Sequence, residues 1–558
     1  MYYLRKNWYV KWLACIVFMT SAASAVHAQD MTGQAISQLL QTDGYQWNAG
    51  DFGRDREVLI RLYQQRDYQP FWFNNGKSTP QAFAVLGVLC NAASYGLRAE
   101  DYNGAALLNR LTLSAGSTDD AQIVQARALL DVDMSVAVLR FMRHLHYGRI
   151  DPRKAGFNLN VNRSDEFDVL ARLNALAAAD DVNQVITTIE PQFLHYQLLK
   201  IALIRYRHLM ATPDLTSLPA FSGSSIKPGG EYSGAAALRL LLTAEGDLSG
   251  DATAGTGTSL DPQLVEGLQH YQKRHGLIAD GVLGKQTFVA LTTPFSQRVR
   301  QIELTLERWR WLPRLQSPMI VVNIPQFRLF AFNSNDDREA NLLRMDVIVG
   351  QAFVHTQTPV FLADMKYLVF RPYWDVPANI VEREILPEIS RNPDYLQHNQ
   401  FELVRGQADD SPIVPATPDN IAQLAAGSLR LRQRPGANNA LGEVKFMLPN
   451  SYNVYLHSTP AKKLFAASHR AFSHGCIRVS DPEGLAEYVL HYASDAWTRE
   501  GIEAAMQGKD NQRVYLRMPI PVMIVYGTVM ANEAGQVQFF SDIYGYDRKL
   551  EKILNAAL

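Results

Sequence analysis

The chain has 558 residues, of which 47% are hydrophobic and 20% are charged, and its formal net charge is −1. This length predicts about three or four domains with cores of their own. The ordinary composition argues against a collagenous, coiled-coil or largely disordered chain. The near-neutral charge provides no basic field that would indicate nucleic acid as a partner. Three cysteines, Cys15, Cys90 and Cys476, are too few for a disulfide scaffold.

Residues 1–28 have the pattern of an export signal. Basic residues precede an apolar run, and Val26-His27-Ala28 offers small side chains at the −3 and −1 positions of a cleavage site. The strongly apolar part is shorter than the ~20 residues of a bilayer span, which favours cleavage over an uncleaved inner-membrane anchor. We therefore expect an exported protein, and cleavage would also remove Cys15.

Residues 40–212 are predicted to form an α-helical domain. Apolar residues within 121–145 recur three and four positions apart, which places them on one face of a helix. Gly148 and Pro152 follow as stop signals. Cys90 ends an apolar run and is expected to be a buried helix position, because a free cysteine often packs as a small core residue.

Residues 213–233 are rich in Pro, Gly and Ser and are predicted to be a linker. Residues 234–295 then form a small unit with three predicted helices, the second opened by Asp261 as N-cap and Pro262 at the first helical position. The following segment 276–284 reads GLIADGVLG. A helix, this "GL..DG..G" pattern and a further helix resemble the peptidoglycan-binding domain 1 family. A three-helix spacer without a ligand is the alternative interpretation.

From residue 300 to 558 the hydrophobic pattern changes to the alternation of period two that is typical of strands. The predicted strands are rich in Val, Ile, Phe and Tyr and cover 319–324, 328–332, 345–349, 366–370, 453–457 and 522–526. This domain is predicted to be mainly β, so the whole chain is expected to be a multidomain α+β protein.

The chemically informative stretch lies at 457–479. His457 ends a predicted strand, and Ser473-His474-Gly475-Cys476 follows after a spacer of fifteen residues. A thiol acts as a nucleophile only when ionised, and a neighbouring imidazole lowers its pKa and takes its proton. Gly475 would let the backbone approach a substrate closely. The helix after this motif is expected to begin with a capping box made by Ser480 and Glu483. The pattern indicates acyl transfer by a thiol.

This motif resembles the signature of the L,D-transpeptidase catalytic domain, the YkuD-like family, in which Ser/Thr-His-Gly-Cys is followed by an apolar residue and Asn or Arg. Further matching segments are 307–313, 371–377, 431–436, 438–442 and 445–447. Together they are similar to a large periplasmic branch that adds an α-helical scaffold domain and a wall-binding domain to the enzyme. The resemblance implies that 378–435 is a substrate-capping insertion, and a structural excursion is the alternative. Within it, 380–389 is predicted to be a helix and 405–421 a loop.

Two histidines compete for the role of base. His474 lies two residues before Cys476, so on an extended segment both side chains would point to the same side. The resemblance implies instead that His457 is the base and Cys476 the nucleophile. His474 would then shape the pocket and support the cysteine loop.

Other candidate site residues surround this pair. Ser473 is expected to hydrogen-bond within the loop, and the backbone N–H groups of Gly475 and Cys476 are candidates for an oxyanion hole. Tyr455 shares a strand face with His457 and either lines the site or packs ordinarily. Arg478 either binds a substrate carboxylate or carbonyl, or makes a structural ion pair.

Two other interpretations of Cys476 would exclude a role as nucleophile. Zinc bound by His457, His474 and Cys476 suits the ligand types, but no paired zinc motif is present. A Cys90–Cys476 disulfide would disable the thiol, and the different contexts of the two cysteines argue against it.

The resemblance implies a periplasmic enzyme that cleaves tetrapeptide stems of peptidoglycan, releases D-Ala and forms 3→3 cross-links through a diaminopimelate amine. It implies that no metal or organic cofactor is needed. It also implies acylation of Cys476 by carbapenems, and other cell-wall synthases and carboxypeptidases as partners. The alternatives are an L,D-carboxypeptidase, a transferase that attaches a lipoprotein lysine, an exchange enzyme for D-amino acids, and a non-catalytic wall-binding scaffold.

Overall fold

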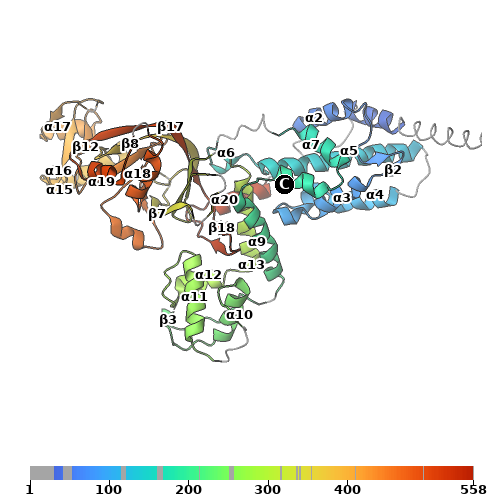
Figure 1. The fold of residues 1–558 in the computed structure, drawn as a ribbon, viewed down its shortest axis with the longest axis horizontal. Helices are drawn as coiled ribbons and strands as arrows, with labels where there is room; N and C mark the ends of the chain where they lie inside the picture. The colour runs from blue at the N-terminus through green and yellow to red at the C-terminus, as the bar shows by residue number, and fades with distance from the viewer. Residues whose placement is uncertain are drawn as a thin grey trace, which may run out of the picture. The chain divides into compact units, whose positions relative to one another are not determined.

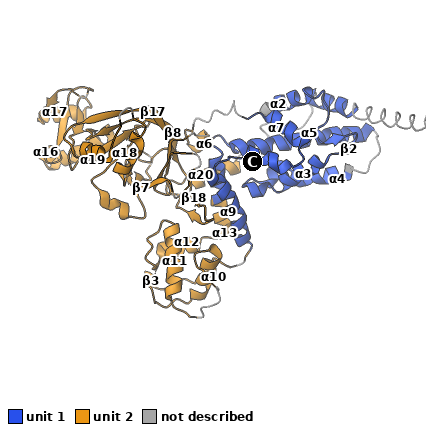
Figure 2. Cartoon of the chain, viewed as in Figure 1, with its two compact units in different colours: residues 1–151, 161–211, 302–311 blue, residues 152–160, 212–301, 312–558 orange. Residues whose placement is uncertain are grey.

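A computed structural model describes most of the chain, namely residues 31–41, 53–114, 121–159, 167–212, 214–250, 257–313, 317–334, 337–338, 341–353, 355–408, 410–493 and 496–556. The predicted signal 1–28 and Cys15 lie outside these ranges. Within them, no helix is both long and apolar enough to cross a membrane. The chain divides into two compact units (Figures 1 and 2). Unit 1 comprises 1–151, 161–211 and 302–311, and unit 2 comprises the remainder.

Unit 1 is helical, as the periodicity of its sequence predicts (Figure 2). Its helices include one at residues 31–41, followed by α2 (Gly53–Gln64), α3 (Pro80–Cys90), α4 (Gly104–Ser114), α5 (Ala121–Tyr147), α7 (Val169–Ala178), α8 (Val182–Ile189) and α9 (Leu194–Met210), together with the later part of α13 (Phe295–Trp309). The predicted apolar face of 121–145 is the buried face of α5, which packs in the core of this unit.

The expectation for Cys90 is wrong, because this side chain is exposed. The buried positions of α3 include Ala82, Val85, Leu86 and Leu89, which recur at helical spacing on one face. Cys90 is the last residue of α3 and lies about 100° around the helix from Leu89. Both Cys90 and Cys476 are free thiols.

The small domain of unit 2 contains α10 (Ala235–Glu245), α11 (Pro262–Arg274) and α12 (Lys285–Leu291), with a two-stranded pairing of β3 (Ser225–Ile226) and β4 (Leu283–Gly284). The predicted cap is confirmed, since Asp261 Oδ1 accepts a hydrogen bond of 2.8 Å from the Leu264 N–H. Gly281 has a φ of +69°, and a Cβ there would lie 2.7 Å from Val265. The glycine of the "DG" pattern is therefore required by both backbone conformation and packing.

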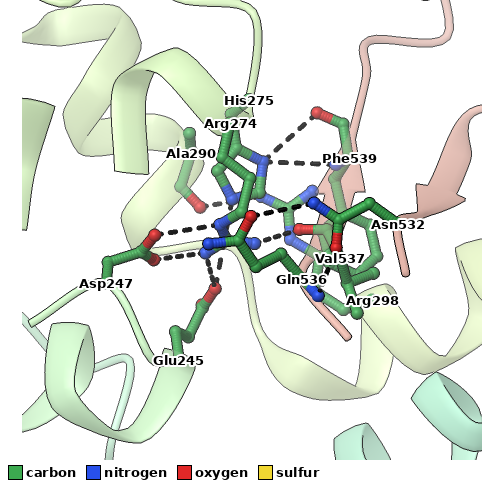
Figure 3. Close-up of polar contacts among 10 residues, drawn as sticks. All are labelled: Glu245, Asp247, Arg274, His275, Ala290, Arg298, Asn532, Gln536, Val537 and Phe539. Atoms are coloured by element: carbon green, nitrogen blue, oxygen red, sulfur yellow. Dashed lines mark hydrogen bonds and ion pairs between the residues drawn. The ribbon is translucent and has the colours of Figure 1, made fainter. Parts of the chain in front are cut away.

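A buried ionic cluster joins this domain to the hairpin of β18 (Val529–Ala531) and β19 (Val537–Phe539) (Figure 3). Arg274 pairs with both Glu245, at 2.7 Å, and Asp247, and it also donates to the Val537 carbonyl. Arg298 lies over the ring of Phe539 at 4.5 Å. A buried cation needs such partners, because an unpaired one would cost several kcal/mol.

The second part of unit 2 is built around a sheet in the order β15-β7-β16-β14-β13-β8-β17-β5-β6, and an additional pairing of β7 with β6 closes it into a barrel-like sheet (Figure 1). The strands are β5 (Met319–Asn323), β6 (Arg328–Phe332), β7 (Leu343–Gly350), β8 (Phe361–Phe370), β13 (Val444–Met447), β14 (Leu456–His457), β15 (Ala471–Ser473), β16 (Ile477–Val479) and β17 (Gln512–Val525). The α+β architecture is thus confirmed, with helical elements preceding a β-rich domain.

Between β8 and β13 the chain forms a separate layer with its own apolar core. A four-stranded sheet in the order β11-β10-β12-β9 is made by β9 (Trp374–Asp375), β10 (Phe401–Val404), β11 (Ile413–Val414) and β12 (Arg430–Gln433). A helical run spans α14 (Ala378–Ile380), the π-helical η3 (Val381–Ile385) and α15 (Leu386–Arg391). The segment expected to be a loop at 405–421 contains β11 and the start of α17 (Pro418–Ala425), which Thr417 caps through the Asn420 N–H. We call this layer, residues 374–433, the cap subdomain.

The helix after the cysteine motif is α18 (Pro482–Leu490). The expected capping box of Ser480 and Glu483 is wrong. Asp481 is the N-cap and accepts from the Gly484 N–H at 2.9 Å, whereas Ser480 Oγ accepts from the Asp346 N–H. Pro482 stands at the first helical position only when Asp481 is the N-cap, because a cap at Ser480 would place this proline at the second position.

Candidate active site

Cys476 lies in the short connection between β15 and β16. Gly475, which precedes it, has a φ of +121°, a conformation that side chains rarely adopt. A Cβ at Gly475 would make only ordinary contacts, the nearest at 3.7 Å from the Gln357 carbonyl. Glycine is therefore required here by backbone conformation rather than by crowding within the chain.

Two adjacent strands bring four candidate residues close together. His457 on β14 is the register partner of Arg478 on β16, and Leu456 is the partner of Ile477. As register partners, His457 and Arg478 lie on the same face of the sheet. Tyr455 and Cys476 directly precede these two strands, and their side chains are joined by a hydrogen bond. The rings of Tyr455 and His457 are 5.7 Å apart, edge to face.

The hydrogen bonding of His457 identifies its tautomer. Its Nδ1 lies 2.6 Å from the carbonyl oxygen of Ser458, which can only accept, so Nδ1 carries the proton. The Nε2 atom then has a free lone pair. Burial, reinforced by the charge of Arg478, lowers the pKa of His457 to about 3. The ring is therefore a neutral imidazole at neutral pH.

The thiol of Cys476 is also neutral at rest. Its Sγ donates to the Asn453 carbonyl at 3.6 Å. Burial raises the pKa of the Cys476 thiol, although hydrogen bonds from Tyr455 act in the opposite direction. This differs from the expectation that an imidazole would lower that pKa. Among the described residues, no hydrogen bond joins the thiol to His457 or His474; catalytic contacts often tighten only when substrate binds.

His474 is engaged elsewhere. Its Nε2 lies 2.6 Å from Oε1 of Glu384, which belongs to the π-helical turn of the cap subdomain. The side chain is about a third exposed. His474 therefore connects the cysteine loop to the cap, an arrangement that a free general base would not have.

The hydrogen bonds of Ser473 constrain the choice of oxyanion donor. Ser473 Oγ donates to the Cys476 carbonyl at 2.5 Å and accepts from the Gly475 N–H at 3.2 Å. The Gly475 N–H is therefore already occupied, which argues against its expected role in an oxyanion hole. The Cys476 N–H has no acceptor among the described residues. It is therefore the backbone donor that is available to a substrate oxygen.

Two cations flank His457 on the neighbouring strands. Arg478 on β16 and Lys445 on β13 are both register partners of His457 in the sheet. Within the described part of the chain, Arg478 makes no recorded ion pair, and its Nε is buried without a hydrogen-bond partner. Both cations also act on the Cys476 thiol electrostatically. A guanidinium without a partner in the described residues can form a charge-assisted hydrogen bond with an anionic group.

Several residues of this site carry no sequence motif. Asn453 contacts Cys476, and Glu384 contacts His474. Lys445 is the register partner of His457, and Thr358 hydrogen-bonds to Gly475. Only the fold brings these residues to the site. In the described residues, no group of three or more His, Cys, Asp or Glu side chains could bind a metal ion.

Comparison with known families agrees with this geometry. The L,D-transpeptidase catalytic domain matches residues 317–520, so the β-rich domain with its cysteine motif is a domain of that class. A scaffold domain matches 57–203, and a "Putative peptidoglycan binding domain" matches 233–291. The chain is 29% identical over 288 residues to a protein of Haemophilus influenzae named "Putative L,D-transpeptidase". That alignment covers 52% of this chain and 56% of the length of the relative.

Proposed function

We propose that this protein is an exported peptidoglycan L,D-transpeptidase with Cys476 as nucleophile and His457 as base. The observation that supports this most is the tautomer of His457. Its Nδ1–H is committed to the Ser458 carbonyl, so Nε2 is the nitrogen that can accept a proton, and the strand paired with that of His457 begins directly after Cys476. His474, whose Nε2 faces Glu384, has no equivalent freedom.

The first half-reaction forms a thioester. Cys476 Sγ turns from the Asn453 carbonyl, gives its proton to His457 Nε2 and bonds to the carbonyl carbon of diaminopimelate in a tetrapeptide stem. The Cys476 N–H donates to the developing oxyanion. When the C–N bond to D-Ala breaks, His457 returns the proton to the leaving amine. The products are an acyl-enzyme and free D-alanine.

The second half-reaction forms the cross-link. The side-chain amine of diaminopimelate on another stem attacks the thioester carbon, and His457 takes a proton from that amine. The C–S bond breaks, and the proton passes to the Cys476 thiolate. The product is a 3→3 cross-link. Exclusion of water by the cap subdomain favours the amine over hydrolysis.

Arg478 and Tyr455 supply binding groups for the donor stem. The terminal carboxylate of D-Ala lies one residue from the carbonyl that is attacked, and the unpaired Arg478 guanidinium matches it in charge. The small domain, matched by a peptidoglycan-binding family, would bind the wall polymer. No cofactor is required by any of these steps.

The test is incubation of the purified protein with disaccharide-tetrapeptide, followed by mass analysis. Cross-linked dimers from the wild type and none from Cys476→Ala are expected. Tripeptide monomers alone would indicate an L,D-carboxypeptidase. Products only with an added lysine peptide or D-amino acid would indicate a lipoprotein transferase or an exchange enzyme. Binding to sacculi without any product would contradict the enzyme assignment in favour of a scaffold.

A further inference from the structure

Thr358 is a buried residue in the connection between β7 and β8, and its side chain contacts the cysteine loop. Its Oγ1 donates a hydrogen bond of 2.8 Å to the carbonyl oxygen of Gly475. The same Oγ1 accepts from the Gly350 N–H at 2.9 Å. A hydroxyl has one proton, and the amide donor occupies a lone pair, so that proton is directed to Gly475.

The backbone of Thr358 is fixed by a residue from the C-terminal part of the domain. Tyr544 Oη donates to the Gly350 carbonyl at 2.6 Å and accepts from the Thr358 N–H at 3.2 Å. The backbone N–H of Tyr544 in turn donates to Tyr526 Oη, which donates to Asp542. Thr358 is thus positioned by a continuous chain of hydrogen bonds rather than by a loop alone.

The bond to Gly475 determines where the next amide proton points. In a trans peptide the carbonyl and the N–H of one unit point in opposite directions. Fixing the Gly475 carbonyl on Thr358 therefore directs the Cys476 N–H to the other side. Glycine permits many backbone conformations, so without this bond the Gly475–Cys476 peptide would have alternatives within reach.

We infer that Thr358 is a positioning residue, which locks the Gly475–Cys476 peptide so that the Cys476 N–H is aimed at the oxyanion of the acyl-transfer step. The role of Thr358 rests on the proposed function in one respect, namely that Cys476 accepts an acyl group. It assigns no direct contact between Thr358 and the substrate. The hydroxyl acts through orientation alone.

The experiment compares two reactions of the same sulfur in a Cys90→Ser background, which removes the exposed second thiol. Acylation by imipenem passes through an oxyanion, whereas alkylation by iodoacetamide does not. Thr358→Val removes the hydroxyl with little change of shape, and Thr358→Ser restores it. Thr112→Val, which removes a hydroxyl bonded to the Leu108 carbonyl on α4, is the matched control.

Acylation of Thr358→Val is expected to slow by on the order of 10²-fold, within the range found when one oxyanion donor is lost. Its alkylation rate should stay within about twofold of the parent, and Thr358→Ser should recover most of the acylation rate. A parallel fall in both reactions would mean a merely structural role and overturn the inference. So would unchanged acylation in Thr358→Val, loss in Thr358→Ser equal to that in Thr358→Val, or no acylation of the parent. Absence of dimers from stem peptides, with these rates as expected, would refute the transpeptidase proposal alone.

Discussion

Nε2 of His474 in the cysteine loop lies 2.6 Å from Oε1 of Glu384 in the cap subdomain, which is hydrogen-bond distance. Glu384 lies in a π-helical turn between two α-helical segments. Such turns are rare and occur often at functional sites. The contact therefore links the cap subdomain to the loop that carries Cys476.

Removing the contact between His474 and Glu384 is predicted to change the ratio of cross-linked dimer to tripeptide. Glu384→Gln removes the charge but keeps the shape, so the cap should open more readily and admit water. Because both side chains are partly exposed, the pair contributes ~0.2–1 kcal/mol, which corresponds to a shift of up to about fivefold. The ratio of cross-linked dimer to tripeptide should fall by that factor. Glu382→Gln, the same change in the same turn, is the control, and an equal effect there would contradict the link.

The two histidines are predicted to differ in importance. His457→Gln removes the base and should lower the acylation rate by ~10²–10⁴-fold, the usual contribution of general base catalysis. His474→Gln should behave like Glu384→Gln, with a change of several-fold at most. The rates are measured with imipenem by intact mass. A larger loss for His474→Gln than for His457→Gln would reverse the assignment.

The pKa directions predict how the thiol responds to pH. Burial raises the pKa of Cys476 and lowers that of His457 to about 3, so the resting pair is uncharged at neutral pH. In the Cys90→Ser background, alkylation by iodoacetamide should rise about tenfold per unit from pH 6 to pH 8, because only the thiolate reacts. Acylation should not decline as the pH falls from 7 to 5, since His457 stays neutral there. A plateau of alkylation between pH 5 and 8 would instead reveal a thiolate–imidazolium pair.

Arg478 is predicted to recognise the end of the donor stem. A charge-assisted hydrogen bond contributes about 1.5–3 kcal/mol, so Arg478→Gln should lower kcat/KM for a tetrapeptide by on the order of 10- to 100-fold. A tetrapeptide with an amidated terminus should be a poor substrate of the wild type and be unaffected by the substitution. An equal fall of kcat/KM for both substrates in Arg478→Gln would mean that the guanidinium stabilises the fold or acts on the thiol and does not bind this carboxylate.

Much of this organisation could be predicted from local pattern. Helical spacing identified α5, alternation identified β5, β6 and parts of β7, β8 and β17, and the glycine pattern identified the small domain. The candidate His457 lies on β14, and the candidate Cys476 directly precedes the adjacent strand β16. These features depend on residues that are near one another in sequence or belong to a compact motif.

What could not be predicted depends on contacts between distant segments. Thr358 meets Gly475 across 117 positions, and nothing in its neighbourhood distinguishes it from any other threonine. Cys90 follows an apolar run but ends its helix one step past the buried face. The sequence predicts the Gly475 N–H as an oxyanion donor, but this N–H donates to the Ser473 hydroxyl, a contact that the motif alone does not reveal.

The central claim is that an acyl group is transferred to Cys476, and trapping that intermediate tests it most directly. The Cys90→Ser protein is mixed with tetrapeptide alone, quenched in acid within the first turnover and digested for mass analysis. The account predicts one equivalent of D-alanine together with a thioester adduct on the peptide that contains Cys476, and neither product from Cys476→Ala. Release of D-alanine by Cys476→Ala, or an adduct on any other residue, would contradict it.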